Sequence, residues 1–147
     1  MRLRSQARRM AMQYLYQMDL TKGDCETPET FLRGQSSDES IRRFALSLVL
    51  GVHERLDPIN EMLRRTAQNY ALERIGAVER NILRLGAGEL LMKSTPPKVI
   101  IDEMVELAKQ FGGKDSGSFV NGILDRLMRE CSTAPDAPAP DAPDATE

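Results

Sequence analysis

The segment that decides the fold is VERNILRLGAGELLMK, residues 78–93. Its apolar side chains recur at the spacing of one helix face; they include Val78, Ile82, Leu85 and Leu90. Gly86 and Gly88 lie within this repeat and look like a Gly-x-Gly nucleotide motif, but no strand precedes them. Small residues inside an apolar helical repeat allow neighbouring helices to approach closely. The segment is therefore predicted to be a helix packed against other helices.

On both sides of this segment the chain shows further helical patterns, separated by short breaks at glycine, proline and Asp-Pro positions. The expected helices cover residues 4–20, 29–33, 41–56, 58–68, 78–93, 99–111 and 116–130. The only strand-like run is KVII, and it opens a helical pattern. The sequence therefore predicts an all-α fold, a compact bundle of six or seven helices without a sheet.

Charge is distributed unevenly along the chain of 147 residues, although its formal net charge is only −2. The first 18 residues hold four arginines and no acid, whereas residues 132–147 hold four acids and no base. The latter stretch, STAPDAPAPDAPDATE, has too little apolar surface to fold and is predicted to be disordered. We expect one helical domain over residues 1–131, followed by an acidic tail over residues 132–147.

The first helix carries a polar face that core packing does not explain. On a helical wheel its apolar face holds Ala7, Met10, Ala11, Tyr14, Leu15 and Met18. The opposite face holds Arg2, Arg9, Gln13 and Tyr16. An aromatic ring beside arginines is the combination that stacks bases and holds phosphates in single-stranded RNA binding. The alternative is a solvated arginine face with Tyr16 covering a neighbouring helix, and the charge pattern alone favours this alternative.

The last helix offers a second aromatic residue outside its buried face. That face is formed by Val120, Ile123, Leu124 and Leu127. Phe119 lies in the first turn, directly after KDSGS and away from the apolar stripe. Backbone N–H groups at a helix N-terminus attract phosphate, and an exposed ring beside them is suited to base stacking. Packing of Phe119 under the preceding loop is an equally supported alternative.

Patterns typical of enzymes and metal sites are absent from the sequence. His53 is the only histidine, and no HExxH, GxSxG or Walker A motif occurs. Glu103 and Glu106 have a spacing compatible with acid–base chemistry, but solvated helix faces often carry that spacing. We expect a protein that is not an enzyme and that holds no metal or cofactor.

The cysteines and the apolar runs indicate a cytoplasmic location. Cys25 and Cys131 are far apart and form no CxxC pair, so two free thiols in a reducing compartment are expected. No apolar run approaches the roughly 18 residues that cross a bilayer. The basic start of the chain is followed by no hydrophobic region, so it is not expected to be a secretory signal or to engage a membrane.

Five segments carry a resemblance to a known family. They are RRMAMQYLYQMD (8–19), FALSLVLGVHERLDPIN (44–60), ALERIGAVERNILRLGAGELL (71–91), PPKVIIDEMVELAKQFG (96–112) and DSGSFVNGILDRL (115–127). In this combination and order they resemble the NusB family of bacterial transcription antitermination proteins. The resemblance covers about residues 3–130. Its most specific part is the segment at residues 115–127, because it follows the segment at residues 96–112.

The resemblance implies an all-helical fold of two small subdomains and a function in transcription antitermination, notably of ribosomal RNA. Proteins of this family bind the boxA segment of nascent RNA in partnership with NusE, which is also a small-subunit ribosomal protein. The pair joins antitermination complexes on RNA polymerase. Members of the family occur as monomers and as homodimers, so the resemblance is compatible with either state.

The resemblance also implies roles for individual residues. The matching RNA-binding positions are Arg4, Arg8, Arg9, Tyr16, Arg84 and Phe119. Glu79 matches a position that meets NusE, and Asp115 matches a position linked to the same complex. Tyr16 and Phe119 are the two aromatic residues that the helical patterns left unexplained, and this agreement favours RNA contact over the packing alternatives.

Three features depart from the family pattern. Ser118 stands where the family often has Lys or another longer side chain, so one basic RNA contact is expected to be missing. Tyr70 stands where a Trp is common. The acidic tail over residues 132–147 matches no family feature.

Two other functions stay open on the sequence. One is an isolated RNA-binding domain related to ribosomal RNA cytosine methyltransferases, but such an enzyme needs a long C-terminal cofactor domain. The other is a helical protein-interaction module that does not bind RNA. The module would leave the clustered arginines without a role.

Overall fold

The computed structural model describes residues 2–68 and 70–133. Within these residues there are seven α-helices, one short 3-10 helix and no strand, which confirms the all-α prediction. The helices are α1 (Arg2–Thr21), α2 (Pro28–Gln35), α3 (Glu39–Glu54), α4 (Leu56–Thr66), η1 (Leu72–Arg74), α5 (Ala77–Met92), α6 (Pro97–Phe111) and α7 (Ser116–Thr133). Most of the predicted tail (132–147) lies outside the described residues, and α7 includes the first two residues of the tail, Ser132 and Thr133.

Local capping sets several helix boundaries. The Asp38 carboxylate accepts hydrogen bonds from the backbone N–H groups of Ser40 and Ile41 at 2.9 and 3.3 Å, which starts α3. Lys93 ends α5 in the left-handed conformation, with φ 58°. Gly112 ends α6 with an extended backbone rather than a left-handed one. The α4 helix begins at Leu56, so Pro58 is its third residue rather than its first.

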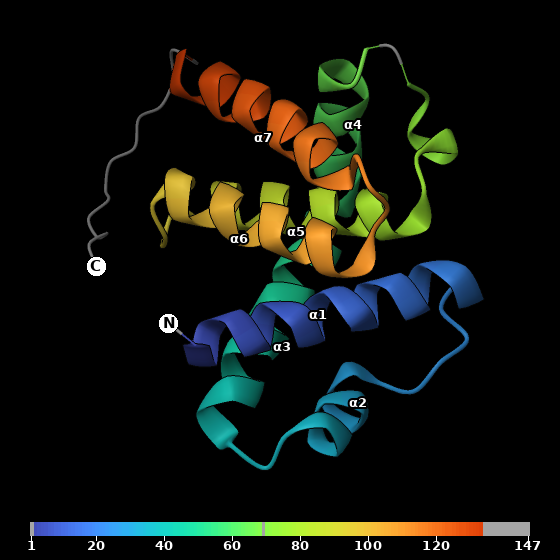
Figure 1. Ribbon diagram of the computed structural model, residues 1–147. Helices are drawn as coiled ribbons and strands as arrows, with labels where there is room; N and C mark the ends of the chain where they lie inside the picture. The colour runs from blue at the N-terminus through green and yellow to red at the C-terminus, as the bar shows by residue number, and fades with distance from the viewer. Residues whose placement is uncertain (1, 69, 134–147) are drawn as a thin grey trace.

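Helix α5 lies at the centre of the fold (Figure 1). It packs against α1 and α3 on one side and against α4, α6 and α7 on the other. Every residue from 81 to 90 is buried except the half-buried Arg84. The main core therefore runs through both halves of the molecule, while α1, α2 and α3 add a small core of their own around Leu32.

The two glycines of α5 mark the closest approaches to neighbouring helices. A Cβ atom added at Gly88 would lie 2.9 Å from Cγ2 of Val52 on α3. A Cβ atom at Gly86 would lie 2.8 Å from Cδ1 of Leu124 on α7. These distances are shorter than normal carbon–carbon contacts, so the glycines allow α3 and α7 to pack on opposite sides of α5.

Helix α1 is enclosed more completely than its helical wheel predicts. All six predicted core residues are buried or half-buried, but Met12 and Arg8 are buried as well. These two residues lie one turn apart on the side that faces α5 and α6. The helix is thus held between α2 and α3 on one side and α5 and α6 on the other. No helix in the part of the chain described has both the length and the apolar character to span a membrane.

Replacing Gly88 by alanine tests the close packing of α3 on α5. Gly88→Ala should lower the free energy of unfolding by about 1–2 kcal/mol, because the stiff, branched Val52 cannot easily move away from the new methyl group. Gly122→Ala is a matched control, since nothing lies within 4 Å of a Cβ at that position. The control should be neutral or stabilising, because alanine favours a helix more than glycine does. Urea unfolding measures both variants, and equal effects would contradict the packing role.

Candidate nucleic-acid interface

Arg8 is placed inside the fold and not on the surface. Its Nε donates to Oε2 of Glu89 at 2.6 Å and one of its NH groups donates to Oε1 at 2.9 Å. Both side chains are only 3% exposed. Glu103 of α6 adds a second carboxylate at 3.9 Å from the guanidinium. An RNA contact of Arg8 stays a prediction; in this structure its Nε and one NH group donate to Glu89, and its buried side chain packs α1 against α5.

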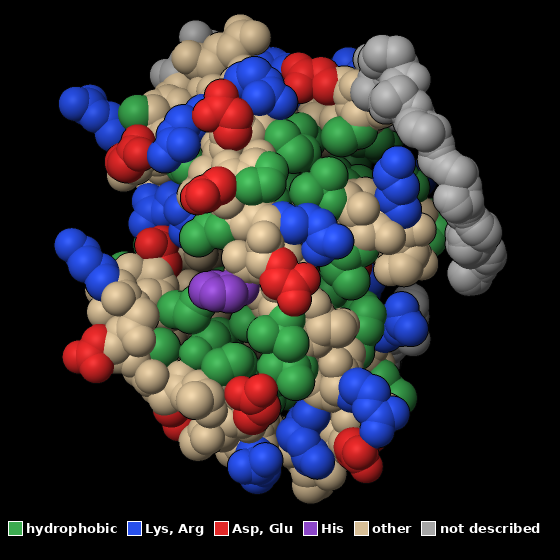
Figure 2. Space-filling view, turned by 180° about the vertical axis from the view of Figure 1, so that it is seen from behind, with side chains coloured by type: hydrophobic (Ala, Val, Ile, Leu, Met, Phe, Trp, Pro, Cys, Tyr) green, Lys and Arg blue, Asp and Glu red, His purple; other side chains and the backbone are tan. Residues whose placement is uncertain are grey.

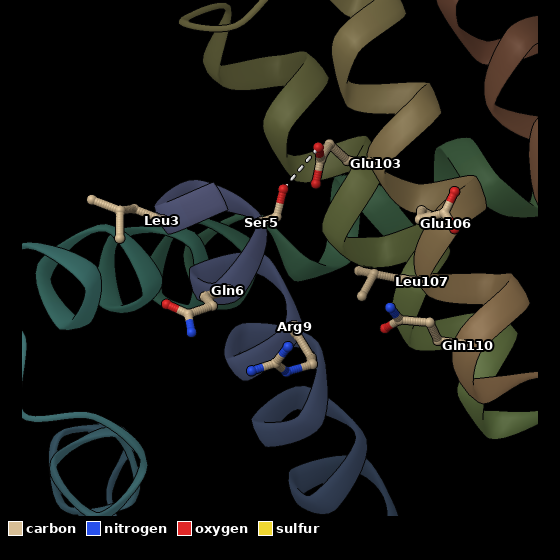
Figure 3. A pocket seen from close by; sticks show the side chains of 8 residues that line it. All are labelled: Leu3, Ser5, Gln6, Arg9, Glu103, Glu106, Leu107 and Gln110. Carbon is tan, nitrogen blue, oxygen red and sulfur yellow. Dashed lines mark hydrogen bonds between the residues drawn. The ribbon is translucent and has the colours of Figure 1, made fainter. Parts of the chain in front are cut away.

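Arg4 and Arg9 remain available at the surface. Arg4 is exposed, and its guanidinium carbon lies 4.3 Å from the centre of the Phe44 ring on α3. Arg9 is half-buried and lines a groove of about 460 Å³ between α1 and α6. Figure 3 shows this groove, with Ser5 of α1 hydrogen-bonded to Glu103 of α6 at 3.0 Å. The groove also contains Glu106, so Arg9 lies in a mixed electrostatic setting, unlike Arg4.

Tyr16 is half-buried and packs against the main core. The packing alternative considered for this residue is thus realised for part of its ring. The rest of the side chain is accessible to solvent, so contact with a ligand is geometrically allowed.

Arg84 belongs to a compact polar cluster that ties α5 to the end of α1. Its Nε donates to Asn60 of α4 at 3.0 Å, and it forms an ion pair with Asp19 at 3.3 Å. Asp19 also accepts hydrogen bonds from Arg80 at 2.8 Å and from Asn81 at 2.9 Å. The half-buried guanidinium of Arg84 is therefore held by internal partners. A phosphate that bound Arg84 would compete with Asp19.

The carboxylate of Asp19 is stabilised in its charged form by this cluster. Burial favours the neutral acid, but the hydrogen bonds from Asn81 and Arg80 and the charges of Arg84 and Arg80 outweigh burial. Together they hold the pKa of Asp19 below its ordinary value. The cluster therefore keeps its ion pairs at neutral pH.

Phe119 lies with the predicted partner residues rather than with the arginines of α1. Phe119, Glu79 and Asp115 line the same pocket of about 330 Å³. The ring of Tyr70 meets that of Phe119 edge to face, with centroids 5.2 Å apart. Asp115 is exposed, and the Ser116 hydroxyl donates a hydrogen bond to Glu79. The pocket combines aromatic rings with two carboxylates and the guanidinium of Arg74, a composition suited to a protein partner as well as to a base.

The candidate residues thus occupy separate places on the molecule. Arg4 and Arg9 lie near the start of α1, Arg84 lies in the cluster around Asp19, and Phe119 lies at the start of α7. The pockets lined by Arg9, by Arg84 and by Phe119 have no lining residue in common, although Arg80 of the Asp19 cluster donates a hydrogen bond to the carbonyl of Ile75, which lines the Phe119 pocket. A ligand that touches all of them must therefore extend across the surface.

Sequence reasoning missed two residues that the structure places beside the candidates. Phe44 stacks on Arg4, and the signal that singled out Tyr16, an aromatic residue beside arginines, also occurs in Arg42-Arg43-Phe44. Asp19 had no comparable signal, because its partners come from positions more than 60 residues away.

The remaining residues that chemistry could use are dispersed. His53 is exposed on the face shown in Figure 2, where it lies between apolar and charged side chains. The described residues contain no group of three or more His, Cys, Asp or Glu that could hold a metal ion. Cys25 and Cys131 are both free, as predicted.

Comparisons with known proteins agree with this fold and sequence. The sequence pattern of the NusB family matches residues 5–129. The transcription antitermination protein NusB of Sorangium cellulosum is 43% identical over 128 residues, which cover 84% of this chain and 90% of that protein. The solved structure of T. maritima NusB has a TM-score of 0.78 and 35% identity, covering 86% of this chain and 91% of that one.

A second solved structure contains a partner and a nucleic acid. It is a complex of the antitermination factors NusB and NusE with double-stranded RNA. The similar chain in it has a TM-score of 0.78 and 29% identity, and the match covers 88% of this chain and 98% of that one. The resemblance stated from the five sequence segments is confirmed by these matches.

Breaking the buried ion pair tests its structural role. Arg8→Met should lower the free energy of unfolding by about 3–5 kcal/mol, because Glu89 then remains buried without its cation. The double variant Arg8→Met/Glu89→Leu should recover most of that loss. Arg43→Met is the matched control, since Arg43 is 74% exposed in its pair with Glu39 and should matter by less than about 1 kcal/mol. Urea unfolding that found Arg8→Met as mild as the control would contradict this role.

Proposed function

The chain belongs to the NusB family of transcription antitermination proteins, and on this premise we propose that it binds boxA-type RNA together with NusE. The resulting complex joins RNA polymerase in antitermination, notably during ribosomal RNA transcription. The observation that carries the proposal is the family match over residues 5–129. It is supported by the similar solved structure in which NusB, NusE and RNA occur together.

The RNA surface that we propose is built mainly from α1. Arg4 and Arg9 supply positive charge for phosphates, and the accessible part of Tyr16 stacks a base. Arg84 and Phe119 extend the path to the cluster around Asp19 and to the start of α7. Arg8 acts indirectly, by holding α1 in place. Ser118 supplies no charge beside Phe119, so the binding energy at that end depends on the aromatic ring.

NusE is proposed to bind at the pocket that contains Phe119, Glu79 and Asp115. The pocket holds two carboxylates, one arginine (Arg74) and two aromatic rings, so it fits a partner surface that carries charged and apolar side chains. Because Phe119 lines the same pocket, RNA and NusE would meet there. This arrangement gives a physical reason for tighter RNA binding in the presence of the partner.

The proposed role is one of binding in the bacterial cytoplasm, without a catalytic step. A homodimer that covers α1 would compete with RNA for the same arginines. Gel filtration of the free protein therefore belongs with every RNA titration. A dimer that dissociates when RNA is added would agree with the α1 surface.

The RNA surface can be tested by anisotropy titration of a single-stranded boxA RNA in the presence of NusE. Tyr16→Ala should weaken binding about tenfold, because losing one base stack costs roughly 1–3 kcal/mol. Arg9→Gln should lower the slope of log affinity against log salt by about 0.7, the contribution of one phosphate contact. Arg65→Gln, which removes an exposed arginine from α4, is the matched control and should behave as wild type.

Unchanged affinity of Tyr16→Ala would contradict the stacking role. Wild-type protein that shows no salt-dependent RNA binding would favour the protein-interaction module instead. A double-stranded RNA of the same sequence should bind more weakly than the single strand, because its bases are not free to stack on the protein.

The partner surface can be tested separately, without RNA. Asp115→Asn should weaken NusE binding about two- to fivefold, because an exposed carboxylate beside the pocket loses its charge. Asp102→Asn is the matched control, because Asp102 is equally exposed but lies on α6. Calorimetry or surface plasmon resonance measures both variants. Equal affinities for both would remove Asp115 from the partner surface.

A further inference from the structure

The ring of Phe44 lies within cation–π distance of two arginines, one buried and one exposed. The guanidinium carbon of Arg4 is 4.3 Å from its centre, and that of Arg8 is 5.3 Å away. Both distances are within the range of cation–π attraction. Phe44 comes from α3, whereas both arginines come from α1. The ring thus links α3 to both a buried and an exposed arginine of α1.

Arg8 and the ring of Phe44 are both fixed in place. Arg8 is held by two hydrogen bonds to Glu89 on α5. The Phe44 ring is half-buried and packs against the small core shared by α1, α2 and α3. A ring fixed in this way offers a constant surface to the flexible Arg4 side chain. The buried ion pair and the small core thus set where the Arg4 charge lies.

Stacking leaves the hydrogen-bonding capacity of Arg4 intact. A guanidinium that lies over a ring uses its flat face, while its N–H groups point outward in its own plane. Within the described part of the chain, Arg4 has no hydrogen bond and no ion pair, unlike Arg8 and Arg84. Arg9, by comparison, shares its groove with two glutamates. Arg4 is therefore the candidate arginine whose donors and charge are best placed for an added anion.

We propose that Phe44 is a positioning residue for RNA binding, because its ring holds the Arg4 guanidinium in place with its N–H edge free for a backbone phosphate. The inference rests on the proposed RNA-binding function and assigns a role to a residue that touches no RNA itself. An arginine that is already ordered loses less conformational entropy when it binds. Phe44 thereby increases affinity without adding a contact.

A double-mutant cycle on RNA affinity tests this role in the presence of NusE. Phe44→Leu, which removes the ring but keeps an apolar side chain, should weaken binding of single-stranded boxA RNA about two- to fivefold. In the Arg4→Gln background, Phe44→Leu should have no further effect. Phe44→Tyr keeps the ring face and should bind RNA as the wild type does. Circular dichroism and thermal melting of each variant confirm that it is folded at the temperature of the titration.

The possible results distinguish a failure of the positioning role of Phe44 from a failure of the proposed RNA-binding function. If Phe44→Leu weakens RNA binding by the same factor in the wild-type protein and in the Arg4→Gln variant, Phe44 acts only on the fold. That result overturns the positioning role. If wild-type protein does not bind the RNA at all, the proposed function fails first and this inference fails with it. Should Phe44→Leu not fold, Phe44→Met fills the site with a longer flexible side chain and enters the same cycle.

Discussion

Arg8 and Glu89 have to meet, because an ion left alone inside a protein costs several kcal/mol of desolvation. This requirement fixes how α1 lies on α5, since a small rotation of either helix would separate the two charges. The other contacts of α1 follow from that alignment. Met12 enters the main core one turn later, and Asp19 reaches Arg80 and Asn81 near the other end of the helix. The same alignment places Phe44 of α3 beside Arg4.

Local features of the fold could be predicted from the sequence, because they depend on neighbouring residues. The breaks between helices and the close packing at Gly86 and Gly88 are examples. The burial of Arg8 could not be predicted in this way. A helical wheel shows which residues share a face but not how many faces are covered, and α1 is covered by helices on two sides.

The candidate site likewise combines features that depend on neighbouring residues with features that depend on distant segments. Tyr16 and Phe119 were singled out as aromatic residues away from the apolar stripes, but their surroundings depend on distant segments. Phe119 lies beside Tyr70 and Glu79, which precede it by 49 and 40 residues in the chain. Residue roles therefore came from the family resemblance, and the structure adds which side chains are accessible and which are held by internal partners.

Helix α1 is fastened to α5 near both of its ends, by Arg8 at one and by Asp19 at the other. Because α1 is attached to α5 at two points, the spacing of its exposed side chains along the surface is constant. With a rise of 1.5 Å per residue, Arg4 and Tyr16 stand about 18 Å apart along the helix axis. A single nucleotide is too short to contact both Arg4 and Tyr16. An RNA strand that contacted both side chains, as proposed, would therefore have to be longer than one nucleotide.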